Sequence, residues 1–140
     1  MKGLATLIKL HKRTLDELRR SMASLENQKE QLLLLSRTLQ EELKKEMELA
    51  AKTPEMRGFF GDFAKRMRVR QEKIAAEIKE LDKQMDKLRG EIAEAFSELK
   101  KYEIAEENAR LRAAEAASRK ETIELDEIAG QQHRLKKDEP

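Results

Sequence analysis

The feature that most constrains this chain is an apolar repeat that runs without a break from Phe60 to Glu127. Its positions are spaced alternately four and three residues apart, and sixteen of the twenty are apolar. A period of 3.5 residues predicts an α-helix with one narrow apolar seam, which is stable only when another helix packs against it. The positions are Phe60, Ala64, Met67, Gln71, Ile74, Ile78, Leu81, Met85, Leu88, Ile92, Ala95, Leu99, Tyr102, Glu106, Ala109, Ala113, Ala116, Lys120, Ile123 and Glu127.

A second repeat of the same kind lies nearer the N-terminus. Ten of its fourteen positions are apolar. Neither Gly nor Pro occurs from Leu4 to Thr53, so we expect one helix of roughly 75 Å at 1.5 Å per residue. The positions are Leu4, Ile8, His11, Leu15, Leu18, Met22, Leu25, Lys29, Leu32, Ser36, Leu39, Leu43, Glu46 and Ala50.

The composition favours a coiled coil over a globule. Of the 140 residues, 41% are charged and 4% are aromatic, which is typical of chains that bury a line of contact. The formal net charge is only +2, so attraction of the whole molecule to nucleic acid or anionic membrane is weak. There is no cysteine, no apolar run long enough to span a membrane and no signal-peptide core after Met1. We therefore expect a soluble, cytoplasmic protein.

Thr53-Pro54 is the first break, and Gly58 and Gly61 follow it. Proline disfavours α geometry in the residue before it, so the chain is predicted to turn here. Either Pro54 opens the second helix at its first turn, or the turn runs on to Gly61. We expect an all-α, antiparallel coiled-coil hairpin over 1–140, with a helix at 4–53, a turn at 54–61, a longer helix at 62–129 and a mobile tail at 130–140. A parallel dimer of long helices bent at Pro54 is the rival architecture.

The two helices are predicted to be unequal. A turn centred near residue 56 places Leu4 opposite about residue 108. Some twenty residues of the second helix would then overhang, roughly 30 Å. The seam of this overhang is weak, because alanines bury little. A partner, a homodimer contact or fraying would have to account for it.

Catalysis has no support in the sequence. There is no Gly-rich phosphate loop and no nucleophile motif. His11 and His133 lie near opposite ends of the chain with no ligand spacing around them. We predict no enzymatic activity, no metal and no cofactor. On the seam, His11 is interpreted as a polar break that helps to fix register.

Three apolar or basic groups are candidate contact surfaces. Four consecutive leucines, 32–35, cover every face of a helix, so Leu33 or Leu34 should point away from the partner helix. Phe59, Phe60 and Phe63 either close the hairpin end or anchor a partner. The cluster Lys65, Arg66, Arg68, Arg70 and Lys73 contains one acid, Glu72. It is either a solvated helix face or a docking patch for an acidic partner, and it is only a weak nucleic-acid signal.

Basic residues also gather toward both chain ends. The N-terminal group comprises Lys9, Lys12, Arg13, Arg19 and Arg20, and the C-terminal group comprises Arg119, Lys120, Arg134, Lys136 and Lys137. At the open end of a hairpin they would suit an acidic socket. Ordinary surface charge is the alternative, because acidic residues are interleaved with both groups.

Three stretches carry a family resemblance: 4–10 leading into 15–20, 95–103, and 119–129 followed by His133-Arg134. With its size and two-helix plan, the chain resembles along nearly its whole length the FliJ family of flagellar type III export proteins. This family is related to central-stalk-like proteins of injectisomes. The resemblance implies an antiparallel two-helix rod similar to the coiled-coil part of the rotary ATP synthase γ subunit.

The resemblance also implies partners. Such a protein binds the hexameric export ATPase and promotes its assembly and activity, contacts the cytoplasmic domain of the membrane export gate, and helps to recycle export chaperones. Membrane association would occur only through these partners, and no nucleic acid is implied. By analogy the ATPase region would be Lys9, Lys12, Arg13, Arg19, Arg20, Arg119, Lys120 and Arg134. The gate or chaperone region would be Leu33, Leu34, Phe59, Phe60, Arg66 and Arg70. A generic coiled-coil spacer or holdase chaperone is the alternative function.

Overall fold

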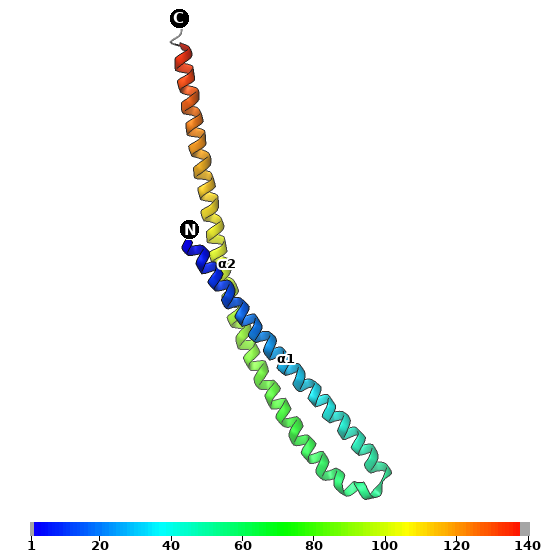
Figure 1. Cartoon of the computed structure of the whole chain (residues 1–140). Coiled ribbons are helices and arrows are strands. Elements are labelled where there is room, and N and C mark those ends of the chain that lie inside the picture. Colours follow the sequence, from blue (N-terminus) through cyan, green and yellow to red (C-terminus); the bar gives the residue numbers. More distant parts are fainter. Residues whose placement is uncertain (1, 138–140) are drawn as a thin grey trace. The chain divides into compact units, whose positions relative to one another are not determined.

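A computed structural model describes residues 2–137, and this part of the chain contains helices and no strand (Figure 1). Helix α1 comprises Lys2–Lys52, the 3-10 helix η1 comprises Pro54–Met56, and helix α2 comprises Arg57–Lys137. The α-helices pack against each other and α2 is the longer. These observations confirm the predicted all-α pair of unequal helices. By its contacts the chain divides into a hairpin unit, residues 13–96, and a terminal unit, the described parts of residues 1–12 and 97–140.

Burial follows the predicted seams. In α1 all fourteen predicted seam positions are buried or half-buried, and between Gly3 and Lys52 only Leu33 is also not exposed. In α2 every predicted seam position from Phe60 to Tyr102 is buried or half-buried. The 3.5-residue period therefore identifies the packed face of each helix correctly.

The turn is made by Thr53 and Pro54. Thr53 has an extended backbone, with φ −123° and ψ 101°, as expected for a residue that precedes proline. Its N–H still donates to the Leu49 carbonyl at 2.9 Å, which is the last bond of the α1 ladder. The Arg57 side chain donates from Nε to the Ala50 carbonyl at 3.2 Å. One of the carbonyls left without a partner at the end of α1 is satisfied in this way.

The core of the hairpin unit is centred on Leu39, which is 2% exposed and clusters with Met67 and Ile74. Partly buried apolar residues pack around this cluster: Leu32, Leu43, Phe63 and Ile78. Each helix thus contributes three apolar seam residues, with Phe63 added beside the seam.

Two polar pairs interrupt the apolar seam of the hairpin unit. The Ser36 hydroxyl donates to Gln71 Oε1 at 2.7 Å, and Gln71 Nε2 donates to the Ser36 carbonyl at 2.9 Å. Lys29 Nζ lies 2.7 Å from Asp82 Oδ1. Lys29, Ser36 and Gln71 therefore each have a partner on the opposite helix, and a shifted register would leave them without one.

The terminal unit packs the first turns of α1 against α2. Ile8 and Leu99 are buried, 6% and 5% exposed. The His11 and Tyr102 rings stack with centroids 4.8 Å apart. A shallow hollow follows, lined by Leu4, Glu106, Ala109, Arg110 and Ala113. This agrees with the expectation that Leu4 lies opposite about residue 108.

Residues 114–137 of α2 form an unpaired arm. Within it only Gly130 is not exposed, and no second helix lies beside it (Figure 1). The arm's 24 residues correspond to about 36 Å of helix. An overhang of this kind was expected from the unequal lengths of the two seams.

The ends of α2 differ from the expected boundaries. The turn was expected to reach residue 61, but α2 begins at Arg57, because Pro54 initiates a 3-10 turn that leads directly into the helix. A tail was expected from residue 130, but α2 continues to Lys137. Gly130 has no positive φ, so it is a helix-interior residue rather than a C-terminal cap. Its cost of about 1 kcal/mol is too small to end a helix flanked by good helix formers.

Candidate partner-binding surfaces

The candidate sites predicted from the sequence are side chains on the surfaces of the two α-helices. Among the described residues, no group of three or more His, Cys, Asp or Glu residues is placed to hold a metal ion. Residues 2–137 contain no helix whose length and apolar character would let it span a membrane.

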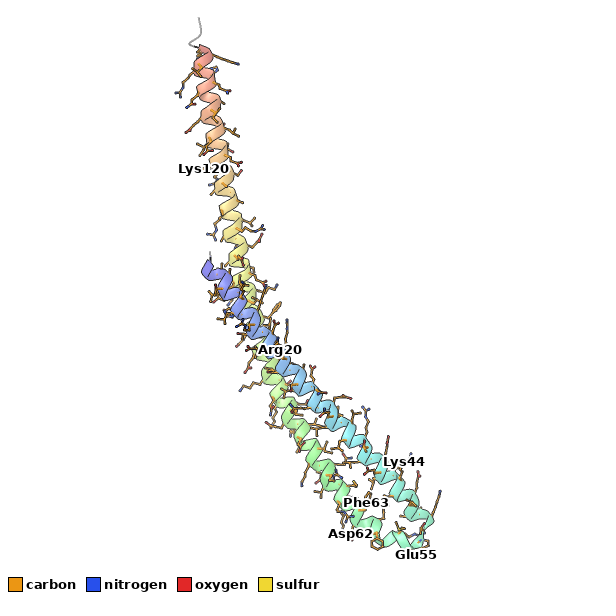
Figure 2. All side chains as sticks on the ribbon, viewed as in Figure 1. Arg20, Lys44, Glu55, Asp62, Phe63 and Lys120 are labelled. Carbon is orange, nitrogen blue, oxygen red and sulfur yellow. The ribbon has the colours of Figure 1, made fainter. Side chains whose placement is uncertain are left out.

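The basic residues of α1 lie in both units. Lys9 and Lys12 are exposed in the terminal unit, and Arg13, Arg19 and Arg20 are exposed in the hairpin unit. Figure 2 shows Arg20 on α1. All five side chains point to solvent, as an electrostatic docking surface requires.

The basic residues of α2 lie on the unpaired arm, where Figure 2 labels Lys120. Arg119, Lys120 and Arg134 are all exposed. Residues 2–12 of α1 pack no farther along α2 than about Ala113, so Lys9 and Lys12 do not join these three in one patch. The predicted basic residues of the terminal unit are therefore arranged along α2 rather than gathered at one point.

Arg134 has an acidic neighbourhood. It lines a shallow hollow over Gly130 together with Asp126 and Glu127. A positive and a negative side chain on one helix face partly cancel each other's field. The arm thus presents alternating charge instead of a uniformly basic surface.

The leucine run behaves as its helical spacing predicts. Leu32 and Leu33 are half-buried, whereas Leu34 and Leu35 are 49% and 40% exposed. Leu32 and Leu35 also line a hollow between the helices with Leu81. Gln28, Gln31, Glu77 and Glu80 complete its lining. The hollow therefore has an apolar floor and a polar rim, and its lining includes the neighbours of the predicted contact residues Leu33 and Leu34 but neither of these two.

The three phenylalanines near the turn have different surroundings. Phe63 packs against the Leu39 cluster and lies near the turn in Figure 2. Phe60 is half-buried, and Phe59 is 73% exposed. Phe63 closes the hairpin end, and Phe59 is left as an aromatic side chain in solvent.

Arg66 and Arg70 lie on the same face of α2 as Phe59, because residues 59, 66 and 70 are seven and four residues apart. They are about two and three turns farther along the helix. Lys65, Arg66 and Arg70 line a shallow hollow whose apolar part is Val69, 50% exposed. The sequence reasoning missed Val69 and Leu35, although their positions outside the seam predict their exposure.

One ion pair in the terminal unit shifts the ionisation of its members. Arg110 donates from Nη2 to Glu107 Oε1 at 2.6 Å and from Nε to Oε2 at 3.2 Å. These hydrogen bonds lower the pKa of Glu107 and raise the pKa of Arg110. The pair holds opposite charges on the solvent side of α2, just before the unpaired arm.

Comparison with protein families gives one match. The profile of the family described as flagellar FliJ protein matches residues 1–138. Searches of the curated proteins and of the solved structures found no significant match. The family match covers both helices and every surface described above.

Proposed function

Because the chain belongs to the flagellar FliJ family, and is thus a non-catalytic component related to flagellar protein export, we propose that it couples the export ATPase to the export gate. In this proposal it binds the hexameric ATPase and promotes ring assembly and hydrolysis. It also contacts the cytoplasmic domain of the gate and the export chaperones. It acts in the cytoplasm and reaches the membrane only through these partners.

The unpaired arm is the observation that carries the proposal. The seam that faces α1, called here the inner seam, continues its heptad spacing past Ala113, but no helix among the described residues covers 114–137. A long helix that is left without an intramolecular partner suits insertion into another assembly. Three of the basic residues proposed to face the ATPase lie on this arm: Arg119, Lys120 and Arg134.

The α1 residues proposed for the ATPase are the exposed cations Lys9, Lys12, Arg13, Arg19 and Arg20. The residues proposed for the gate or chaperones belong to the hairpin unit: Leu33, Leu34, Phe59, Phe60, Arg66 and Arg70. The exposed Phe59 and the Val69 hollow support this second assignment, because aromatic and arginine side chains are the usual anchors of protein interfaces.

Charge reversal tests the ATPase surface. The triple variant R119E/K120E/R134E should bind the purified export ATPase more weakly and stimulate its hydrolysis less than the original chain. Its helicity should be unchanged, because all three side chains are exposed. The matched control K79E/K83E/K87E reverses three exposed charges of the hairpin unit. Equal loss in both variants, or no stimulation by the original chain, would contradict the proposal.

The gate surface is tested separately. The variant F59A/R66E/R70E should lose binding to the cytoplasmic domain of the gate and retain stimulation of the ATPase. The variant K79E/K83E/K87E again serves as the control. If F59A/R66E/R70E binds the gate domain normally, residues 59–70 are not the contact surface.

A holdase or spacer is the second candidate function. The exposed leucines of the run 32–35 favour it, because apolar side chains on a helix surface can bind unfolded clients. It predicts suppression of aggregation of an unrelated unfolded protein, with no specific response from the ATPase.

A further inference from the structure

A second apolar stripe runs along the C-terminal part of α2. Between Leu99 and Lys137 six large apolar residues are exposed, and five of them, 50–69% exposed, share one heptad stripe. Ile123 is the sixth, and it lies on the inner seam instead. The outer stripe, defined by this spacing, comprises Ile104, Glu107, Leu111, Ala114, Ser118, Glu121, Leu125, Ile128, Gln132 and Leu135.

The outer stripe lies nearly opposite the inner seam on the helix. In a two-helix coiled coil these outer positions face water and are normally polar. Between Lys83 and Lys100 they are polar or small: Lys83, Asp86, Gly90, Ala93, Ser97 and Lys100. The apolar character therefore begins at Ile104, close to the point where α1 no longer covers the other side of α2.

We propose that the outer stripe is the interface of an antiparallel homodimer, formed with the same stripe of a second copy of this chain. The stripe is self-complementary about a two-fold axis between residues 119 and 120. In that register Leu111 faces the second copy's Ile128, and Leu125 faces the second copy's Ala114. Ile104 likewise faces the second copy's Leu135, so every large apolar residue of the stripe is covered by one of its own kind or by alanine.

The charges beside the stripe agree with this register. In antiparallel coiled coils, residues that flank the seam on the same side face each other across the interface. Arg110 then faces the second copy's Glu124, and the two-fold axis repeats this pair. Ala117 faces the second copy's Ala117, and Asn108 faces the second copy's Lys136. No like charges are opposed among the flanking positions.

Polar residues within the stripe limit its affinity. Ser118 faces the second copy's Glu121, and Glu107 faces the second copy's Gln132. Such layers select one register at a cost in stability. The overlap of residues 104–135 spans about 48 Å of helix. The geometry therefore predicts a reversible, concentration-dependent dimer.

This inference is independent of the proposed function. Lys120 and Arg134, proposed for the ATPase, lie on the inner-seam side of α2. The dimer is measured with the purified full chain alone, and no ATPase is present. Failure of one proposal therefore leaves the other unaffected.

Sedimentation equilibrium of the full chain, from about 1 μM to about 1 mM, tests the dimer. The original chain should shift from monomer to dimer over this range. The variant L111K/I128K should stay monomeric with unchanged helicity, because both side chains are exposed and lysine is a good helix former. The matched control I123K changes an equally exposed residue of the arm outside the stripe and should dimerise normally.

Cysteine cross-linking tests the direction of the helices, because the chain has no cysteine of its own. Ala117→Cys should form a disulfide with the second copy's Cys at the same position, whereas Leu111→Cys alone should not. A mixture of Leu111→Cys and Ile128→Cys should form a mixed disulfide. A monomer at every concentration, a dimer that persists in L111K/I128K, or efficient self-linking of Leu111→Cys would overturn the proposal.

Discussion

The imidazole ring of His11 stacks on the phenol ring of Tyr102, with centroids 4.8 Å apart and planes inclined by 24°. Both residues occupy inner-seam positions of the terminal unit and are half-buried. Aromatic pairs of this kind contribute about 0.5–1.5 kcal/mol beyond the burial of their area. Beyond Tyr102 the seam of α2 continues mostly with alanines. The ring pair therefore holds the start of α1 on α2 where little other apolar contact is available.

Tyr102→Ala should destabilise the chain by about 1–3 kcal/mol, because it removes the stacked ring and leaves a gap against His11. Urea unfolding followed by circular dichroism measures the change. The control Ile123→Ala, in the exposed arm, should stay within about 0.5 kcal/mol of the original chain. An equal effect of both changes would show that the ring contact contributes nothing specific.

The packed faces of both helices could be predicted from spacing alone, because the 3.5-residue period marks one continuous face from Leu4 to Ala50 and another from Phe60 to Tyr102. The partners of the polar seam residues could not be predicted in this way. Ser36 and Gln71 were both recognised as seam positions, but their pairing depends on where the turn lies to within one residue. The position of the turn depends on how Pro54 starts the 3-10 helix, and the spacing pattern does not contain that information.

The Ser36–Gln71 pair should show coupling in a double-mutant cycle. Ser36→Ala or Gln71→Ala alone leaves the other residue's half-buried polar group without its partner, at a cost of about 1 kcal/mol each. The double variant should cost less than the two changes added together, with a coupling of about 0.5–1.5 kcal/mol. Urea unfolding of the four proteins gives the coupling energy, and purely additive costs would contradict it.

Leu39→Ala should be among the most damaging single changes. Leu39 is 2% exposed at the centre of the hairpin core, and a buried leucine replaced by alanine costs about 2–5 kcal/mol. Leu34→Ala removes the same atoms from a 49% exposed site and should change stability by less than about 0.5 kcal/mol. Thermal unfolding of the two variants measures the contrast.

Gly130→Ala should strengthen the unpaired arm without affecting the hairpin unit. No atom lies within 4 Å of a Cβ built at either Gly130 or Gly90, and both glycines are helical. Alanine is favoured over glycine in a helix by about 0.5–1 kcal/mol. Gly90→Ala should therefore raise the midpoint of hairpin unfolding, whereas Gly130→Ala should raise only the residual helicity of the arm.

The Glu107–Arg110 contact should be visible in a pH titration. Hydrogen bonding from Arg110 lowers the pKa of Glu107. The stabilising effect of this contact is therefore present above the ordinary carboxyl pKa. The effect is lost as pH falls through the lowered value. Arg110→Ala should raise the pKa of Glu107 toward its ordinary value, as followed by the NMR shift of its side-chain carboxyl carbon. An unchanged titration would contradict this assignment.

The candidate surfaces were only partly predictable. Exposure of Leu34 follows from helical geometry, since consecutive residues cannot all face one partner. The expected gathering of the N-terminal and C-terminal basic groups at one end is not observed, because the start of α1 meets α2 near Ala113. Arg119 and Arg134 lie farther along the arm, and no local signal tells which cations approach one another.

The stability of the unpaired arm as a helix affects how strongly a partner can bind it. Within residues 114–137 the helix is held by its own backbone bonds, without a packed neighbour among the described residues. Most of the stability of helices in proteins comes from tertiary packing, and the arm has none, so it can open turn by turn while the Leu39 core stays closed. Its amide hydrogens should then exchange with solvent far faster than those of the core. Whatever binds the arm must also supply the free energy that keeps it coiled, so the strength of that binding will rise and fall with helix propensity.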